Sequence, residues 1–408
     1  MTDTTRPSAA TPPTSGPATA PRPGTPSRLR AINDRAALDL LLEHGPLSRT
    51  RIGTLTGLSK PTASQLLARL EAAQLVVPVG TTLGGPGPNA QLYQVNPAAG
   101  YVAGMDVTRS HIRFAVADIT GRTLAEHLLP TPGRQASGTV RRVADGLAET
   151  LRQAGLQPGC LREITIGTPG ALDPNTNKLR YASHLPGWHS PGLPAELQEA
   201  LGAPVAIEND VNLAAVAERV LGSARDCEDF VLFWAEEGVG AAIVIGGRLH
   251  RGFTGGAGEV GYMPVPGAPV VRHARREQSG GFQELAGANA VLALAKQHGL
   301  GARTAEAAIA RALGTPGAGE EFLAVLAHRL ATGLAAIVAV IDPELVVLSG
   351  GTPTAGGERL RELVQEELTG LAVPRPVLRN STVPGSPVLH GALQRALTAA
   401  RETVFTTA

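Results

Sequence analysis

Side chains suited to binding nucleic acid gather in residues 60–75, KPTASQLLARLEAAQL. A helix there would turn one set of polar groups outward, namely Lys60, Thr62, Ser64, Gln65 and Arg69. Short polar side chains at the start of such a helix can reach base edges, while cations there and at Arg49 can bind phosphate. The pattern predicts a DNA recognition helix, and the alternative is a three-helix bundle whose polar face is only solvated.

The segment that precedes this helix has the pattern of an amphipathic helix. Residues 34–44 would bury one apolar face, made by Ala37, Leu38, Leu41 and Leu42. Gly45 and Pro46 then end the helix. Residues 28–80 carry seven Lys+Arg against four Asp+Glu, a local charge of +3 that suits a phosphate-rich partner.

A short helix and a tight turn connect the two. The stretch SRTRIGTLTG predicts the short helix, with Ile52 and Leu55 facing inward and Gly57 making the turn. Ser59 has the residue type of a helix N-cap, and Pro61 stands in the first helical turn, where its missing N–H costs nothing. The order of elements is therefore that of a helix-turn-helix motif.

The length and composition of the whole chain limit its domain number, its partners and its cellular compartment. Its 408 residues suggest two or three compact units, and a net charge of +1 leaves any nucleic-acid affinity to local patches. The two cysteines lie far apart, so we expect neither a disulfide framework nor a zinc module, and a reducing cytoplasm fits best. The apolar stretch 334–341 is too short to span a bilayer. Residues 1–27, rich in Pro, Thr and Ala, are expected to form a disordered tail.

From residue 100 onward the chain has the pattern of an α/β unit that occurs twice. YVAGMD, HIRFAVAD and TLAEHLLP predict an antiparallel meander, followed by a helix over about 139–153 and the strand EITIGTPG. PVAIEND and a helix from Val211 lead to a second meander, DFVLFWAEEGVGAAIVIGGRLHRG. A long helix, 320–341, then precedes the strand ELVVLSGG, and a last helix closes the chain. Such a duplication predicts two lobes with a ligand cleft between them.

Five short motifs follow one another in this region: GTPG, LPGW, END, EVG and LSGG. In this order they resemble the ROK family (repressors, open reading frames and kinases), and the N-terminal region is similar to the winged helix of ROK repressors of the xylose and N-acetylglucosamine type. The resemblance implies an α/β fold with a winged helix-turn-helix over residues 28–98. A two-lobed ribonuclease-H-like domain, as in actin and hexokinase, would follow over 99–408. The Gly/Pro-rich stretch 84–88 would be the wing, without the arginine that is common there in the family.

The resemblance also implies a sugar site in the cleft. Asn209 and Asp210 match residues that hydrogen-bond sugar hydroxyls, and in kinases this aspartate is the general base. The other matching positions are Gly170, His184, Glu259, Tyr262 and Glu284. Because His184 and Tyr262 replace an asparagine and a histidine that are common in the family, we expect a shifted sugar preference. The alternative for Asp210 is a helix N-cap without a ligand.

The nucleotide side of the cleft departs from the kinase pattern. Kinases of the family have an aspartate followed by a Gly-rich turn, whereas this chain has DVTRS, which keeps Asp106 but has no glycine after it. The second phosphate loop, Gly-Thr-Gly in kinases, corresponds to Glu236, Glu237 and Gly238. Carboxylates there would repel phosphate, so we expect no catalytic residue and no nucleotide cofactor. The stretch around His273, where many members hold zinc, has no cysteine, so no metal is expected either.

These features together predict a cytoplasmic, sugar-responsive transcriptional regulator, most simply a repressor, that does not phosphorylate its effector. Its expected partners are double-stranded operator DNA, a sugar or sugar derivative, and further copies of itself in a homodimer or homotetramer, without a membrane. One alternative is an active ATP-dependent sugar kinase that carries a DNA-binding domain. Another is a DNA-binding protein whose cleft is vestigial and serves only dimerisation.

Overall fold

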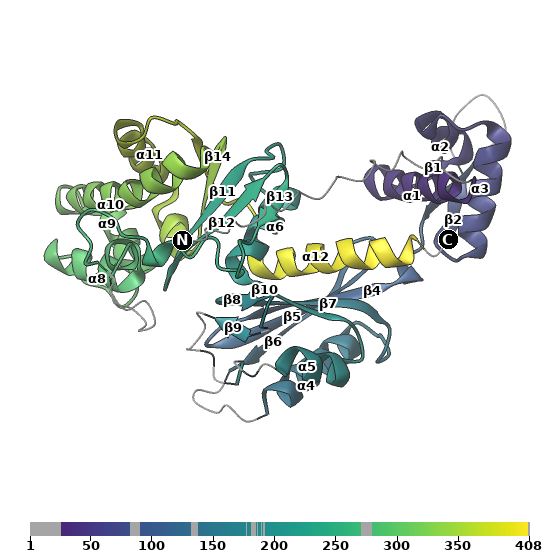
Figure 1. Ribbon diagram of the computed structural model, residues 1–408, viewed down its shortest axis with the longest axis horizontal. Coiled ribbons are helices and arrows are strands. Elements are labelled where there is room, and N and C mark those ends of the chain that lie inside the picture. Colours follow the sequence, from purple (N-terminus) through teal and green to yellow (C-terminus); the bar gives the residue numbers. More distant parts are fainter. Residues whose placement is uncertain are drawn as a thin grey trace, which may run out of the picture. The chain divides into compact units, whose positions relative to one another are not determined.

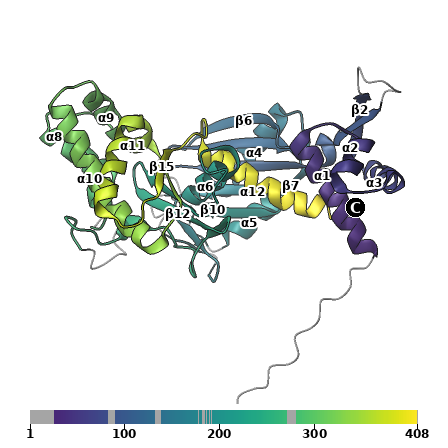
Figure 2. The ribbon, with the colours of Figure 1, turned by 90° about the horizontal axis from the view of Figure 1, so that it is seen from above.

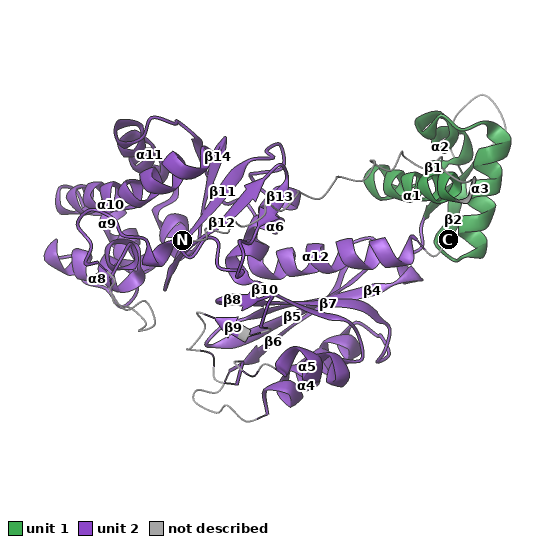
Figure 3. Cartoon of the chain, in the orientation of Figure 1, with its two compact units in different colours: residues 1–94, 408 green, residues 95–407 purple. Residues whose placement is uncertain are grey.

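The computed structural model describes residues 26–81, 90–131, 138–176, 178–180, 185, 187–188, 190, 192–270 and 280–406. The chain divides into two compact units, residues 1–94 with 408 and residues 95–407 (Figure 3). Each unit has its own core, so the two are described one at a time. The stretch 84–88, expected to be the wing, and most of the expected tail lie outside the described residues.

The first unit combines three helices with a small sheet. The helices are α1 (Pro26–His44), α2 (Arg49–Thr56) and α3 (Lys60–Ala72). The strands β1 (Leu47–Ser48), β2 (Val76–Thr81) and β3 (Gln91–Val95) form one sheet of order β1-β3-β2. α2 ends at Gly57, which adopts a left-handed conformation with φ 71°. The unit thus has the helix-turn-helix arrangement that the sequence predicts.

Serine caps fix where the second and third helices begin. The Oγ of Ser48 accepts a hydrogen bond from the backbone N–H of Arg51 at 3.3 Å. The Oγ of Ser59 accepts one from the N–H of Thr62 at 3.4 Å, and Pro61 lies in the first turn of α3. Each cap satisfies a backbone donor that the helix itself leaves unpaired. The predicted N-cap at Ser59 is therefore confirmed.

Three details of this unit differ from the sequence prediction. α1 begins at Pro26 rather than at residue 34, because Pro is favoured at a helix start and the Arg, Leu and Ala that follow favour helix. α3 ends at Ala72 because the chain turns at Gln74, where φ is 58°. Leu55 is 37% exposed instead of facing inward. α2 packs through Ile52 and Gly53, and a β-carbon at Gly53 would lie 3.2 Å from the carbonyl oxygen of Leu58.

The second unit contains two five-stranded sheets with the same connectivity, one in each lobe (Figure 1). Lobe one has β4 (Tyr101–Val107), β5 (His111–Asp118), β6 (Thr123–Pro130), β7 (Leu161–Thr168) and β10 (Val205–Asn209), in the order β10-β7-β4-β5-β6. Lobe two has β11 (Phe230–Ala235), β12 (Val239–Ile245), β13 (Arg248–His250), β14 (Leu345–Ser349) and β15 (Val377–Asn380), in the order β13-β12-β11-β14-β15. In each sheet the first three strands pair antiparallel and the last two join parallel. The predicted duplication is confirmed.

Helices cover both sheets. Lobe one has α4 (Thr139–Gln153), α5 (Leu193–Leu201) and the hairpin β8 (Ala171–Asp173) and β9 (Lys178–Arg180), and α6 (Asp210–Leu221) leads to lobe two. Lobe two has η2 (Val260–Tyr262), α7 (Gln283–Ala286), α8 (Ala288–Gln297), α9 (Ala305–Leu313), α10 (Ala318–Ile341) and α11 (Gly351–Leu371). η1 (Pro97–Ala99) precedes the first sheet, and α12 (Pro387–Val404) closes the fold. Leu185 and Trp188 of the LPGW motif are buried in the core of lobe one.

The closing helix α12 returns from lobe two and lies along the sheet of lobe one, as both views show (Figures 1 and 2). Glycines allow the close approach. A β-carbon at Gly104 of β4 would lie 3.0 Å from the side chain of Leu393, and one at Gly167 of β7 would lie 2.6 Å from Val388. α12 also crosses α6, where Gly391 faces the backbone of Leu213. The two helices that connect the lobes are thus in direct contact.

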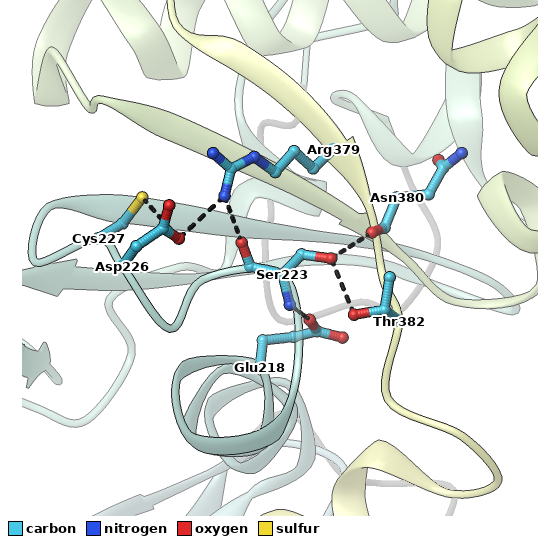
Figure 4. A network of polar contacts seen from close by, with 7 residues as sticks. All are labelled: Glu218, Ser223, Asp226, Cys227, Arg379, Asn380 and Thr382. Carbon is cyan, nitrogen blue, oxygen red and sulfur yellow. Dashed lines mark hydrogen bonds and ion pairs between the residues drawn. The ribbon is translucent and has the colours of Figure 1, made fainter.

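The loop after α6 is hydrogen-bonded to the segment that leads into α12 (Figure 4). The Oγ of Ser223 donates to the carbonyl of Asn380 at 2.7 Å, and its N–H donates to the carboxylate of Glu218 at 2.7 Å. Arg379 donates to the carbonyl of Ser223 at 2.7 Å and to Asp226 at 3.0 Å. Glu218 is fully buried. Both connections between the lobes are therefore held together at one place.

Helix α10 is the one helix among the described ranges that is long and apolar enough to cross a membrane. Its 24 residues extend well beyond the apolar stretch 334–341 that the sequence analysis singled out. Phe322, Leu326 and Leu334 of α10 are fully buried in the core of lobe two. Packing in that core accounts for the apolar composition of α10, since one face of the helix needs apolar side chains.

Candidate functional site

The carboxyl ends of three parallel strands bring candidate ligands together in lobe one. Asp106 of β4 pairs in register with Gly167 of β7, and Asn209 of β10 pairs with Thr168 of β7. Asp210 follows Asn209 as the first residue of α6. Asp106, Asn209 and Asp210 therefore lie along one sheet edge, where open α/β sheets commonly bind ligands.

Asn209, rather than Asp210, is the N-cap of α6. Its Oδ1 accepts a hydrogen bond from the N–H of Asn212 at 3.0 Å. Its Nδ2 donates to the carbonyl of Gly170 at 3.0 Å and to Oδ1 of Asp210 at 3.1 Å. Gly170 adopts a φ of 82°, which a residue with a side chain rarely adopts. The N-cap role that the sequence analysis considered for Asp210 is thus played by Asn209. The side chain of Asn209 also holds Gly170 and Asp210 in position.

Four carboxyl groups from both lobes, those of Asp106, Asp210, Glu236 and Glu259, are close enough to interact electrostatically. The pKa of Asp210 is raised to about 7, chiefly by burial; the hydrogen bond from the N–H of Val211 opposes the rise, and the nearby charges of Asp106, Glu259 and Glu236 add to it. Burial also raises the pKa of Glu259 to about 7. The pKa of Asp106 is raised by burial, although Ser386 donates a hydrogen bond to its Oδ2 at 2.8 Å. Two of these carboxyl groups, Asp210 and Glu259, therefore ionise near neutral pH.

These shifted carboxyl groups make the stability of the protein depend on pH. In the unfolded chain Asp210 and Glu259 ionise at their ordinary pKa values of 3.8 and 4.5, whereas in the folded protein they keep their protons to about pH 7. The folded state binds more protons in this window, so its stability is greatest below it and falls as the pH rises through 7. We expect a higher melting temperature at pH 5 than at pH 8, measured by calorimetry. A double variant with Asp210→Asn and Glu259→Gln should show a flatter profile, and an unchanged profile would contradict this assignment.

The turn between β11 and β12 brings further negative charge to the cleft. Burial and the charges of Glu306, Glu237 and Asp106 raise the pKa of Glu236, which accepts a hydrogen bond from the backbone N–H of Gly351. Glu237 is exposed and lies 3.6 Å from Arg109 of the DVTRS loop, so an ion pair joins the two lobes here. Such an exposed pair contributes only about 0–1 kcal/mol. The DVTRS loop and the turn between β11 and β12 thus contact each other.

One residue that the sequence analysis missed supports this turn. The side chain of Gln283, in α7, donates to the carbonyl of Glu237 at 3.1 Å and accepts from the N–H of Val239 at 2.8 Å. Its neighbour Glu284, a predicted sugar ligand, is exposed. Tyr262, also predicted, ends η2, three residues after Glu259. The role of Gln283 could not be predicted from the sequence, because its partners are backbone groups of a turn that is distant along the chain.

Two predictions of the sequence analysis fall on residues that the structure does not describe. His184, a predicted sugar ligand, lies outside the described residues, and so does the stretch around His273. Within the described ranges no group of three or more His, Cys, Asp and Glu side chains is arranged to hold a metal ion.

The start of α3 carries the side chains predicted to contact DNA. Lys60, Thr62 and Gln65 are exposed, and so is Arg49 at the start of α2. The Oγ of Ser64 instead donates to the carbonyl of Lys60 at 2.9 Å, and the Oγ1 of Thr62 lies 2.8 Å from the Oγ of the cap Ser59. The exposed face at the start of α3 is thus polar and positively charged.

Arg69 differs from the other predicted DNA contacts. Its guanidinium lies 2.6 Å from the carboxylate of Asp34, a residue of α1 that is 1% exposed. A buried carboxylate needs such a partner, because an unpaired buried charge is costly. The structure therefore gives Arg69 a role in joining α1 to α3. No local pattern could have indicated this pair, since its members are 35 residues apart.

Comparison with known proteins identifies both units. The model of the ROK family matches residues 102–392, and a model of the MarR family matches residues 33–82. The chain is 27% identical over 237 residues to the xylose repressor of Bacillus subtilis strain 168. That similarity covers 58% of this chain and 61% of the repressor, so the chain spans less than two thirds of its relative.

Solved structures with the same fold include a regulator and a kinase. A ROK family transcriptional regulator, described as a homologue of the Escherichia coli MLC protein, superposes with a TM-score of 0.74 at 20% identity. The superposition covers 93% of this chain and all of that one, and it shows the shared fold. The ROK hexokinase of Thermus thermophilus has a TM-score of 0.61 at 29% identity, over 72% of this chain and 97% of the hexokinase. Both superpositions therefore include the two-lobed fold of the second unit.

Proposed function

This chain belongs to the ROK family and begins with a unit similar to the MarR family, and from this premise we propose that it is a DNA-binding repressor that responds to a sugar. The observation that carries the proposal is the exposed, positively charged start of α3, in a chain whose second unit brings carboxyl groups of both lobes together. The relationship to a xylose repressor supports the same function.

We infer that the sugar binds at the sheet edge of lobe one and contacts lobe two. Ionised Asp210 and Glu259 would accept hydrogen bonds from sugar hydroxyls, and such charge-assisted bonds are about twice as strong as neutral ones. Gly170 would line the same pocket through its backbone. The remaining proposed ligands are His184, Asn209, Tyr262 and Glu284. Asn209 contributes mainly by holding Gly170 and Asp210 in place.

We propose further that the protein does not phosphorylate its effector. We infer that Glu236 and Glu237 correspond to the second phosphate loop of the family's kinases, where their carboxylates would repel phosphate. Within the described residues, Arg109 pairs with Glu237. Glu306 adds a third negative charge beside Gly351, at the start of α11. Like charges at such distances repel by about 1 kcal/mol or more per pair. This arrangement favours a sensor over a kinase.

The proposal includes the partners and the place of action. Repressors of this kind act on palindromic DNA as two-fold oligomers, so we propose a homodimer or homotetramer in the cytoplasm. Residues 28–98 would bind the operator and residues 99–408 would bind the sugar. The sugar shifts the balance between two arrangements only if it binds them with unequal affinity, typically by about 1–3 kcal/mol.

A gel-shift assay on the DNA upstream of the protein's own gene tests the repressor function. We expect specific binding at defined salt, weakened by one member of a panel of D-xylose, D-glucose, N-acetylglucosamine and their phosphates. Lys60→Ala should lower the affinity for DNA by about 10-fold. It should also reduce the slope of log affinity against log salt concentration by about one, because one phosphate contact is lost. Lys296→Ala, in α8 of the other unit, is the charge-matched control and should leave binding unchanged.

The outcomes separate the rival functions. Specific DNA binding that no sugar alters, together with no thermal shift by any sugar, would favour a vestigial cleft. A coupled assay with ATP and the same sugars tests the kinase alternative, and we expect no turnover. Phosphorylation without specific DNA binding would replace the repressor with a sugar kinase.

A further inference from the structure

The loop that follows β13 is fastened to lobe one before it reaches Glu259. Arg251, the first residue after β13, has its Nε and NH2 groups each 2.8 Å from Oε2 of Glu208, in β10 of lobe one. Two residues later, the carbonyl of Phe253 accepts a hydrogen bond at 3.2 Å from Nδ2 of Asn175, in the β8–β9 hairpin. A segment that belongs to lobe two by sequence is thus bound to lobe one at two points.

Glu208 is a buried carboxylate whose two oxygens are both engaged. Its side chain is 8% exposed, against 47% for Arg251. Its Oε1 accepts hydrogen bonds from the N–H of Asn209 at 3.1 Å and from Nδ2 of Asn212 at 3.0 Å. Arg395 of α12 lies farther away, 3.8 Å from Oε2. Arg251 therefore supplies the nearest compensating charge, and its removal leaves a buried anion with one distant cation.

Glu208 is adjacent in sequence to one half of the proposed sugar site, and Arg251 begins the loop that leads to the other half. Glu208 immediately precedes Asn209 and Asp210. On the other side, the loop closes on itself, because the N–H of Ala257 donates to the carbonyl of Arg251 at 3.1 Å. The carbonyl of Gly258 then accepts from the N–H of Ala241 in β12 at 2.8 Å, and Glu259 follows. Arg251 thus anchors the start of the loop that leads to Glu259, and β12 anchors its end.

We propose that Glu208 and Arg251 are positioning residues: their ion pair holds the loop 252–258 so that Glu259 faces Asp210 across the cleft. The inference rests on the proposed sugar-binding function. A sugar that contacts Asp210 and Glu259 together binds best when the pair is formed, so the pair links occupancy of the cleft to the arrangement of the lobes. Arg251 contacts no sugar in this scheme and acts only through Glu259.

A double-mutant cycle between Arg251 and Glu259 tests whether one acts through the other. The variants are Arg251→Met, Arg251→Lys, Glu259→Gln and the double Arg251→Met/Glu259→Gln. Arg361→Met is the control, because Arg361 also lies in lobe two and pairs with Glu358 at 2.7 Å, within α11. Titration calorimetry of the full-length proteins uses the tightest binder among D-xylose, D-glucose and N-acetylglucosamine.

We expect Arg251→Met to weaken sugar binding by about 10- to 30-fold, and the double variant to bind no worse than Glu259→Gln within about 3-fold. Arg251→Lys should restore part of the affinity, since a lysine keeps the charge but loses the two-pronged contact. The control variant should bind like the wild type. If the fold-loss of sugar affinity in the double variant equals the product of the fold-losses in the two single variants, the proposal is overturned, because Arg251 then acts independently of Glu259.

Hydrogen exchange without any sugar gives a second readout that does not depend on the ligand. Residues 252–259 should exchange about 10-fold faster in Arg251→Met than in the wild type, with unchanged protection in α10 and β14. Equal exchange in this loop would overturn the positioning role even if sugar affinity fell. If the wild-type protein binds none of the sugars, the proposed function fails. The proposal that Arg251 positions a sugar ligand then fails too, whatever the exchange rates are.

Discussion

Replacing Asp210 with asparagine is expected to abolish most of the response to sugar while the protein stays folded. The asparagine side chain would have nearly the same shape but could not become an anion, and a hydrogen bond to a charged group contributes about 1.5–3 kcal/mol. We therefore expect sugar affinity to fall by about 10- to 150-fold at pH 8, measured by titration calorimetry. DNA affinity without sugar should be unchanged, because the residue belongs to the other unit.

The same substitution should not destabilise the protein at pH 8. Burial and three neighbouring carboxyl groups oppose ionisation of Asp210, so its removal relieves repulsion that the folded state otherwise contains. Asp145→Asn is the matched control, since Asp145 is an exposed residue of α4 with a 3.8 Å contact to Arg141. Wild-type sugar affinity in Asp210→Asn would remove Asp210 from the site, and equal losses in both variants would point to a general effect.

Replacing Gly391 with alanine is expected to destabilise the second unit strongly. A β-carbon at Gly391 would lie 2.5 Å from the carbonyl carbon of Leu213 and closer still to its oxygen, in the crossing of α12 over α6. Backbone cannot rotate away as a side chain can, so the two helices would have to separate. Because overpacking costs about 1–3 kcal/mol or more, we expect a loss of about 3 kcal/mol in the free energy of unfolding. Urea denaturation of the full chain measures it.

A second glycine gives a matched control for this prediction. Gly370 also lies in a helix, α11, and a β-carbon there would meet no atom within 4 Å. Gly370→Ala should stabilise the protein by up to about 1 kcal/mol, because alanine favours helix over glycine. Opposite signs of the two changes in the free energy of unfolding would identify the close crossing of α6 and α12 as the cause of the destabilisation by Gly391→Ala. Equal effects would mean that α6 and α12 can separate easily.

The elements of the first unit were predictable because their signals are local. Ser59 and Pro61 determine the start of α3 within a few residues, and Gly57 supplies the turn before it. The antiparallel meanders were predictable for the same reason, since their strands are separated only by short turns. Leu55 was predicted wrongly, because the buried face of an eight-residue helix depends on which side its neighbour approaches.

The residues proposed for the sugar site could be named from the order of motifs, but their roles could not. Asn209 and Asp210 are adjacent and similar in type, and only the geometry makes Asn209 the cap of α6. The raised pKa of Asp210 comes from burial and from the charges of Asp106, Glu259 and Glu236, which are far apart along the chain. A sequence pattern does not show which charged groups approach one another in the folded chain.

The sequence by itself therefore determined the order of the elements, the N-cap of α3 and the duplication of the lobes, because each follows from contacts among residues a few positions apart. Only the tertiary structure decided which charges pair. Arg69, predicted to contact DNA, pairs with the buried Asp34, and Arg251 pairs with Glu208 across 43 positions. The physical reason is that a buried carboxylate requires a cation nearby in space, and the fold alone brings that cation to it.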